Sequence, residues 1–366
     1  MPQSSLILCE SASDFAAAVI ERGRFDGDTV VLKPEPGAGA DITSLSGGAT
    51  LTSPPVASPI PFNDVLMSWN IETPPDAGFA AELRVGRREE AWSPWLHVGE
   101  WGAWSDPSPR VTSFEDGRID VDYFRSDQRF GRAQYRIRAT SRGGAPGAAI
   151  HVRRVALCFS DMTSHDRHGA SGSAGLPDAR KPQSTVSPSS RAARRLDVPF
   201  RSQQAEPADV SGRICSPTSL AMVLGYRGVD LPTSVVASTC YDPGHDIYGN
   251  WTRAIQGAFS LGVPGYLTRF SDWDAVQRCI ANNQPLIISI KVREPGGLAG
   301  APYQATDGHL LVLCGFTSDG DVHVNDPASR TAETGIRVYR RAEMERAWLR
   351  DGGGVAYVLE TRTPLP

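Results

Sequence analysis

The feature of this sequence that most limits its fold is residues 162–195, where apolar side chains almost vanish and Ser, Gly, Pro, Ala and Arg dominate. Such a segment cannot bury enough surface to offset the conformational entropy that ordering it would cost. We therefore predict a flexible linker there. It divides the 366-residue chain into an accessory domain at residues 1–161 and a second domain at residues 196–366.

The composition argues against several classes of partner. Hydrophobic residues make up 40% and charged residues 21%, and a net charge of -4 without long blocks of one sign favours neither nucleic acid nor an anionic membrane. No run of 18 apolar residues is present, so no membrane span is expected. The first residues lack the basic and apolar regions of a signal peptide. This predicts a cytoplasmic protein, with secretion as the alternative.

Residues 1–161 consist mostly of short alternating runs separated by Gly, Pro and Asp. The clearest runs are 28–34, 64–73, 79–88, 117–124, 133–141 and 149–161. This pattern is typical of a mostly-β domain, either an antiparallel β-sandwich or a jelly roll. One helix is predicted, at residues 11–23, with Ser11 or Ser13 as its N-cap and Gly23 at its end.

Residues 196–366 mix helices and strands, with the helices first. Helices are predicted at 215–228, 250–262 and 271–284, and strands at 285–292, 309–316, 321–327 and 356–360. A Ser-Asp-Gly turn joins the strands at 309–316 and 321–327 as a hairpin. Helices followed by an antiparallel sheet indicate an α+β domain.

Cys215 stands at the first turn of the helix predicted at 215–228. Unpaired backbone N–H groups and the helix dipole favour negative charge there, which lowers a thiol pKa and makes the thiolate available as a nucleophile. The alternative is a buried structural cysteine. We expect that for most of the six cysteines, which form no C-x-x-C pair and so no zinc ribbon or thioredoxin motif.

His309 begins an apolar strand, and Asp326 ends the strand after it. With a tight turn at 319–320, Leu313 faces Asp326, and positions 309, 311 and 313 share a face, so the two polar side chains point to the same side. This register leaves an offset that a longer loop or a bulge must shorten. An imidazole beside a thiol can act as its base, and a carboxylate can fix its tautomer. A structural histidine and an Asp-Pro turn cap are the alternatives.

Gln203 precedes Cys215 by twelve residues, and Gln204 is its rival. A side-chain amide near a nucleophile can donate a hydrogen bond to a developing oxyanion, although most glutamines in loops are only solvated.

Five blocks together resemble the bacterial double-glycine leader peptidase-like group, which includes the bacteriocin-processing peptidases (peptidase family C39), and in particular its stand-alone relatives. The blocks occur in the family's order and spacing within residues 196–366: VPFRSQ (198–203), CSPTSLAMVL (215–224), YGNW (248–251), TDGHLLVLCGF (306–316) and DVHVNDPA (321–328). The resemblance implies a papain-like cysteine peptidase with a peptide or protein substrate. No cofactor is expected, and no metal, because the spacing of Cys240, His245 and Asp246 matches no standard metal site.

Position by position, the resemblance implies Cys215 as nucleophile, His309 as base, Asp326 as third member and Gln203 as oxyanion donor. It also suggests that Asn250 and Trp251 bind substrate or shape the cleft. Ser216 departs from the family, which usually has Gly after the nucleophile.

Two other functions remain open, a catalytically silent binding module and an acyl or amide transferase with the same triad. Five of the eight tryptophans lie between residues 69 and 104, where they could bind a glycan or peptide or only pack.

Overall fold

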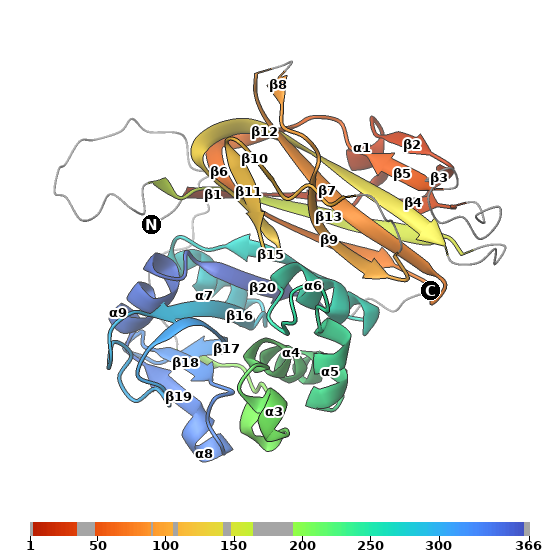
Figure 1. The fold of residues 1–366 in the computed structure, drawn as a ribbon. Helices are drawn as coiled ribbons and strands as arrows, with labels where there is room; N and C mark the ends of the chain where they lie inside the picture. The colour runs from red at the N-terminus through yellow and green to blue at the C-terminus, as the bar shows by residue number, and fades with distance from the viewer. Residues whose placement is uncertain are drawn as a thin grey trace, which may run out of the picture.

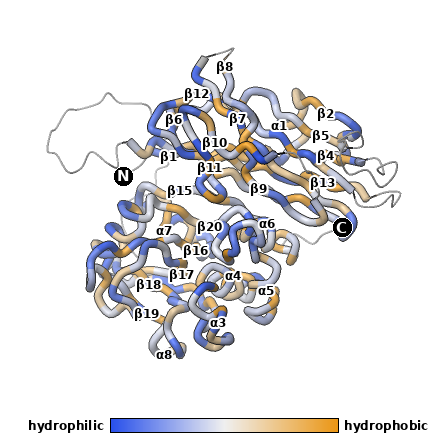
Figure 2. Tube along the Cα trace, viewed as in Figure 1, coloured by the Kyte–Doolittle hydropathy of each residue, from blue (hydrophilic) through white to orange (hydrophobic). Residues whose placement is uncertain are grey.

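The computed structural model describes residues 3–34, 48–88, 91–104, 109–141, 148–163 and 193–361. Most of the predicted linker, residues 164–192, lies outside this range. The described residues form two parts, each built around its own sheet, with the N-terminal part above the C-terminal part in Figure 1. Hydrophobic stretches run through the strands of both sheets (Figure 2).

Thirteen strands of the described N-terminal residues join in one antiparallel sheet. They are β1 (Gln3–Cys9), β2 (Val19–Glu21), β3 (Gly23–Asp26), β4 (Thr29–Leu32), β5 (Ala49–Thr52), β6 (Val56–Glu72), β7 (Ala77–Arg88), β8 (Ala91–Trp92), β9 (Leu96–Gly102), β10 (Ser113–Phe114), β11 (Gly117–Asp120), β12 (Tyr123–Ser141) and β13 (Ile150–Asp161). Strand β12 pairs with β6 through its first half and with β7 and β5 through its second half. The sheet therefore bends into a near-barrel around one core, and the mostly-β prediction is confirmed.

The helix predicted at residues 11–23 is wrong over most of its length. Only α1 (Ala12–Phe15) is helical, with Ser11 at the N-cap position. Val19–Glu21 instead forms β2, which pairs with Thr50–Thr52 of β5. The helical pattern of this segment gives way to pairing with a strand distant in sequence, a contact that local propensity does not contain.

The C-terminal part is α+β, as predicted. Its helices are η1 (Gln203–Ala205), α3 (Ala208–Ser211), α4 (Cys215–Tyr226), α5 (Thr233–Cys240), α6 (Trp251–Ser260), α7 (Trp273–Ala281), α8 (Ala332–Gly335), α9 (Arg341–Met344) and η2 (Glu345–Arg350). Its strands are β14 (Arg194–Arg195), β15 (Gly265–Arg269), β16 (Leu286–Val292), β17 (Thr306–Phe316), β18 (Val322–Asn325), β19 (Ile336–Tyr339) and β20 (Val355–Leu359). They follow the antiparallel order β15-β20-β16-β17-β18-β19, with β14 beside β17. No helix within the described ranges is long and apolar enough to cross a membrane.

The two faces of strand β6 pack against different parts of the molecule. Between Asp64 and Ile71 its odd positions, including Val65, Met67 and Trp69, point into the core of the N-terminal part. Its even positions point to the C-terminal part, where Leu66 joins that core and Asn70 pairs with the backbone of Gly265 through both amide atoms, at 3.0 and 3.2 Å. Successive side chains of a strand alternate between faces, so a single segment fills one core and docks against the other part.

Several buried polar side chains form hydrogen bonds across this boundary. The guanidinium of Arg269 in β15 binds both carboxylate oxygens of Asp64 in β6, with N–O distances between 2.9 and 3.1 Å, and both side chains are almost fully buried. Gln256 of α6 donates to the Ile71 carbonyl at 2.8 Å and accepts from the Ile71 N–H at 3.1 Å. Buried donors and acceptors that find partners in this way fix the relative position of two surfaces.

Candidate functional site

Cys215 is the first residue of α4, and its side chain is partly exposed. Residues 216–224 behind it are buried, as expected from an apolar run that continues around the whole helix. Ile214, at the N-cap position, provides no side-chain cap. The N–H groups of the first turn therefore remain available to a negative charge at this end of the helix.

His309 lies in β17, and Asp326 follows β18 directly. The strands pair Val312 with Asn325 and Leu313 with Val324, and the register shifts at a bulge between Leu313 and Gly315. Continued by one residue, this register places Asp326 opposite Leu311 rather than Leu313. The connection at 317–321 shifts the register by one residue from that of a turn at 319–320, and the bulge shifts it by one more. Together they shorten the offset from His309 and keep both side chains on one side of the sheet.

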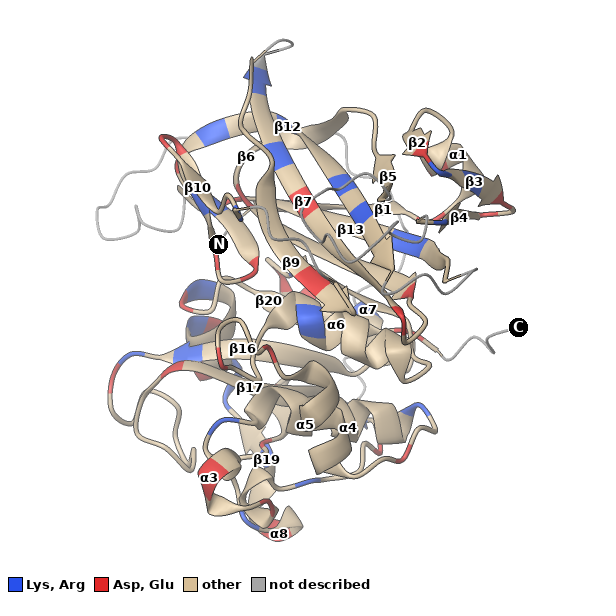
Figure 3. Ribbon diagram, turned by 45° about the vertical axis from the view of Figure 1, so that its right-hand side comes forward, with Lys and Arg blue, Asp and Glu red and all other residues tan. Residues whose placement is uncertain are grey.

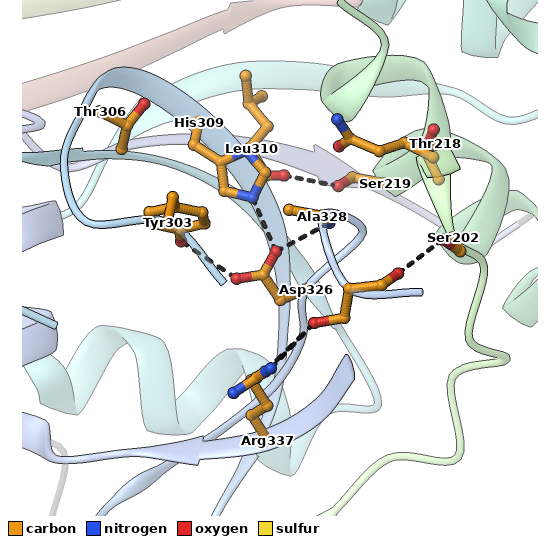
Figure 4. Close-up of polar contacts among 12 residues, drawn as sticks. Ser202, Thr218, Ser219, Tyr303, Thr306, His309, Leu310, Asp326, Ala328 and Arg337 are labelled. Carbon is orange, nitrogen blue, oxygen red and sulfur yellow. Dashed lines mark hydrogen bonds and ion pairs between the residues drawn. The ribbon is translucent and has the colours of Figure 1, made fainter. Parts of the chain in front are cut away.

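The carboxylate of Asp326 is fully buried and accepts four hydrogen bonds. Figure 4 shows those from His309, Ala328 and Tyr303. Its Oδ1 lies 2.8 Å from Nε2 of His309 and accepts from the Ala328 N–H at 3.1 Å. Its Oδ2 accepts from the hydroxyl groups of Tyr303 at 3.1 Å and Tyr339 at 3.0 Å. Burial alone would raise the pKa of Asp326, but the bond to His309, its charge and the other donors hold that pKa below its usual value.

The sequence pattern did not predict that these two tyrosines belong to the site. Tyr303 comes from the loop before β17, and its ring lies 4.9 Å from the His309 ring between centroids. Tyr339 ends β19, next to β18. Only the pairing of β18 with β19 brings Tyr339 to Asp326, and no local sequence signal marks either residue.

His309 and Cys215 each shift the pKa of the other. Burial lowers the pKa of His309, but the bonds and negative charges of Asp326 and Cys215 outweigh burial and raise it. Burial likewise raises the pKa of the Cys215 thiol. The interaction with His309 and the backbone N–H groups of Leu310 and Ser216 outweigh that effect, so the thiol pKa lies below its ordinary value. Because Nε2 of His309 faces Asp326, Nδ1 is the nitrogen left for the thiol.

A hydrogen bond fixes the nucleophile helix to the histidine strand. Ser219, one turn after Cys215, donates through Oγ to the carbonyl of Leu310 at 3.1 Å (Figure 4). Leu310 follows His309 directly. The bond is buried, so it holds the first turns of α4 against the start of β17.

Gln203 is buried, whereas Gln204 is exposed. The backbone N–H of Gln203 bonds to the Pro327 carbonyl at 2.9 Å, next to Asp326. Its side-chain Nε2 donates to the Ser211 carbonyl at 2.7 Å, and its Oε1 is buried without a partner. One amide N–H is therefore engaged by the last residue of α3, and the second N–H has its hydrogen-bonding capacity left over.

Asn250 and Trp251 lie at the N-terminus of α6, on the boundary with the N-terminal part. Asn250 is the N-cap, since its side chain accepts from the Arg253 N–H at 2.9 Å, and it donates to Asp242 at 2.8 Å. The ring of Trp251 stacks on Tyr123 with centroids 5.5 Å apart. Both residues are engaged in contacts within the protein.

The tryptophans between residues 69 and 104 pack rather than stand free. Trp69 is buried, and Trp101 lies against Arg253. Trp92, Trp95 and Trp104 each lie against arginines of β7 and β12, whose blue bands are visible in Figure 3: Arg84 and Arg132 on Trp92, Arg84 and Arg136 on Trp95, and Arg138 on Trp104. Each of these three rings therefore has at least one guanidinium group against it.

Each of the two parts of the chain matches a known protein family. Residues 195–355 match the Peptidase_C39-like family, and residues 10–160 match the peptidase C39 N-terminal domain. Comparison with the curated proteins finds no match.

Several solved structures resemble one part each. A C39-like peptidase candidate from Bacillus anthracis is 19% identical, with 47% of this chain and 100% of that chain covered and a TM-score of 0.36. A double-glycine-motif protease from an AMS/PCAT transporter, in complex with the leader peptide, is 21% identical over 46% of this chain and 94% of that chain, with a TM-score of 0.31. The C-terminal CBM6 of a laminarinase from Zobellia galactanivorans is 11% identical over 42% of this chain and 98% of that chain, with a TM-score of 0.22.

Proposed function

Because this chain combines a peptidase C39-like family domain with a peptidase C39 N-terminal domain, we propose that it is a cysteine peptidase in which Cys215, His309 and Asp326 form the catalytic triad. The observation that carries this proposal is the buried contact between His309 and Asp326, together with the lowered pKa of the Cys215 thiol. These features supply a thiolate, a base and a group that orients the base.

In the proposed reaction, the Cys215 thiolate attacks the carbonyl carbon of a peptide bond. The protonated His309 ring then gives its proton to the leaving amine, and a thioester to Cys215 remains. Water attacks the thioester while His309 accepts a proton from it, and the carboxylic acid product leaves. Asp326 keeps Nε2 of His309 engaged and stabilises the charged ring.

Negative charge develops on the carbonyl oxygen during both attacks. We assign its stabilisation to the second amide N–H of Gln203 and to the backbone N–H groups at the start of α4. The bond from Gln203 to Ser211 supports this role because it holds the amide in place. Pre-positioned donors cost no reorganisation when the charge appears.

The test is hydrolysis of a peptide library by the full-length chain, with products identified by mass spectrometry. We expect discrete cleavage by the wild type and none by Cys215→Ala. Cys279→Ala is the matched control, since Cys279 is also partly exposed but its pKa is raised by burial. Cleavage retained in Cys215→Ala would rule the proposal out. Transfer to an added amine in place of hydrolysis would indicate the transferase alternative.

A further inference from the structure

The two-residue turn between β11 and β12, formed by Val121 and Asp122, is strained and enters the boundary between the two parts. Val121 has a φ of 63°, a left-handed conformation that a β-branched residue rarely adopts. Asp122 follows it with its side chain buried at 4% exposure. A strained backbone persists only where its surroundings hold it in place, and such positions gather at functional sites.

The carboxylate of Asp122 caps a helix of the other part. Its Oδ2 accepts the backbone N–H groups of Trp251 and, at 3.3 Å, Thr252, the first two residues of α6. The third N–H, of Arg253, bonds to the Asn250 side chain, and the Ala254 N–H makes the first intrahelical bond at 3.0 Å. Every N–H of the first turn thus has an acceptor. For two of these N–H groups, the acceptor is one carboxylate oxygen of Asp122, in the N-terminal domain.

Further contacts hold the same end of α6 to the turn. Thr252 donates through Oγ1 to the Met67 carbonyl at 2.9 Å and to the Asp122 carbonyl at 3.3 Å. Tyr123, next to Asp122, stacks on Trp251 with an interplanar angle of 17°. The N-terminus of α6 is therefore enclosed by the N-terminal domain on several sides.

Helix α6 in turn packs against α4, which begins with Cys215. It also contacts β20, where the hydroxyl of Tyr357 lies 3.0 Å from Oγ of Ser216, the residue after Cys215. Burial is the main cause that raises the pKa of Tyr357, and the negative charges of Asp122 and Cys215 both add to it. Tyr357 thus lies within electrostatic reach of both Asp122 and Cys215.

We propose that Asp122 of the N-terminal domain is a positioning residue for the nucleophile, because it holds the N-terminus of α6 and, through α6 and Tyr357, the first turn of α4. The inference rests on the proposed role of Cys215. It gives the N-terminal domain a part in catalysis: without the carboxylate, two buried N–H groups lose their acceptor, α6 shifts, and Cys215 moves relative to His309.

The experiment measures iodoacetamide alkylation of Cys215 in the full-length chain as a function of pH, by mass spectrometry and without any peptide substrate. Asp122→Ala removes the acceptor, whereas Asp122→Asn keeps an oxygen in its place. Asp120→Asn is the control, since Asp120 lies on the same hairpin and pairs with Arg125 at the surface. Melting curves establish that each variant is folded at the assay temperature.

We expect Asp122→Ala to raise the pH midpoint of Cys215 alkylation by about one unit, a roughly tenfold loss of rate at fixed pH below the midpoint. Asp122→Asn and Asp120→Asn should stay within about twofold of the wild type, a difference of only about 0.3 pH unit. A folded Asp122→Ala with the wild-type profile would overturn the inference. Should Asp122→Ala not fold, Asp122→Leu, whose side chain has a similar shape but no acceptor, takes its place with the same two outcomes.

The pH profile of Cys215 alkylation also depends on groups that titrate near Asp122. Burial raises the pKa of Asp122 to about 7, and Asp242 and His245 of the loop before α6 act on it by charge. Tyr123, the next residue along the chain, and Tyr357 of β20 also have a raised pKa. A change in their titration would also occur in Asp122→Asn, so a shift found only in the Ala or Leu variant reports the lost acceptor.

A failure here is distinct from a failure of the proposed function. If wild-type Cys215 reacts no faster than Cys279, the peptidase proposal fails. If wild-type Cys215 is fast and Asp122→Ala equals it, only the role of Asp122 fails.

Discussion

Nε2 of His309 lies 2.8 Å from Oδ1 of Asp326, with the histidine 6% exposed and the aspartate fully buried. The carboxylate also accepts from two tyrosine hydroxyls and one backbone N–H, so its position is fixed from several directions. A buried charge is stable only with such partners. The pair therefore contributes to the fold as well as to the proposed chemistry, and substitutions separate the two contributions.

Asp326→Asn should preserve the fold better than Asp326→Ala but abolish most of the hydrolysis. The amide keeps an acceptor for the hydroxyls, yet it cannot stabilise a protonated His309, and we expect kcat to fall by roughly two to four orders of magnitude. Asp326→Ala leaves buried donors without an acceptor and should cost about 3–5 kcal/mol of unfolding free energy. Peptide hydrolysis and urea denaturation measure the two effects.

The control for both variants is Asp319→Asn, in the exposed turn between β17 and β18. It should change the unfolding free energy by less than about 0.5 kcal/mol. An Asp326→Asn protein with wild-type kcat would contradict the role of the carboxylate.

The stability that Asp326 contributes should depend on acid pH. Its pKa in the folded protein is lower than the ordinary value of 3.8, so the unfolded chain binds the proton more readily. The contribution is therefore complete above about pH 5 and is lost as the pH falls through 3.8 and then through the folded-state pKa. Urea unfolding between pH 3 and pH 7 should show this loss in the wild type and a smaller loss in Asp326→Asn. Equal slopes for the two proteins would argue against the lowered pKa.

Removing one partner of the buried Arg269–Asp64 ion pair, which joins the two parts, should strongly lower the free energy of unfolding. Arg269→Ala leaves the Asp64 carboxylate buried without its partner, and we expect a loss of about 3–5 kcal/mol in unfolding free energy. Arg293→Ala is the control, since Arg293 pairs with Asp351 but is largely exposed, and it should cost less than about 1 kcal/mol. Equal effects of the two substitutions in urea unfolding would show that the buried pair contributes no more than a surface pair.

Ser216 should not impair the nucleophile although the related family usually has Gly at this position. The residue lies in the first turn of a regular helix and needs no left-handed backbone, and its hydroxyl bonds to Tyr357 in the interior. Ser216→Gly should lower the unfolding free energy by about 1 kcal/mol or more, through helix propensity and the lost bond. Because the bond to Tyr357 belongs to the link that we propose between α6 and the first turn of α4, alkylation of Cys215 in Ser216→Gly should shift to higher pH, in the same direction as in Asp122→Ala. A large gain in rate would mean that the serine hinders the site.

The sequence predicts those features that depend on local pattern. Apolar runs and turn signals mark α4, β17 and β18, and strand parity places His309 and Asp326 on one side. The bulge between Leu313 and Gly315 was anticipated only as one of two ways to shorten the offset. Its position depends on how β17 and β18 pack, which no local pattern records.

Features that depend on distant contacts could not be predicted. Tyr303 and Tyr339 reach Asp326 only through the loop before β17 and the pairing of β19. Strand β6 is buried on both faces, but its sequence has the pattern of a strand that is buried on one face. The reason is that its polar side chains are buried against the other domain, where they form hydrogen bonds. Asp122 is an ordinary turn residue until α6 is placed against it.

The most direct test of the proposed site is the rate of iodoacetamide labelling at Cys215 and at Cys279 in the same molecule, followed from pH 5 to pH 10. Cys215 should react first and already near neutral pH, because its thiol pKa is lowered by His309, whereas burial raises that of Cys279. His309→Ala should move the Cys215 profile to higher pH and leave Cys279 unchanged. Equal rates at the two cysteines in the wild type, or a Cys215 profile unaffected by His309→Ala, would contradict the assignment of Cys215 as an activated nucleophile.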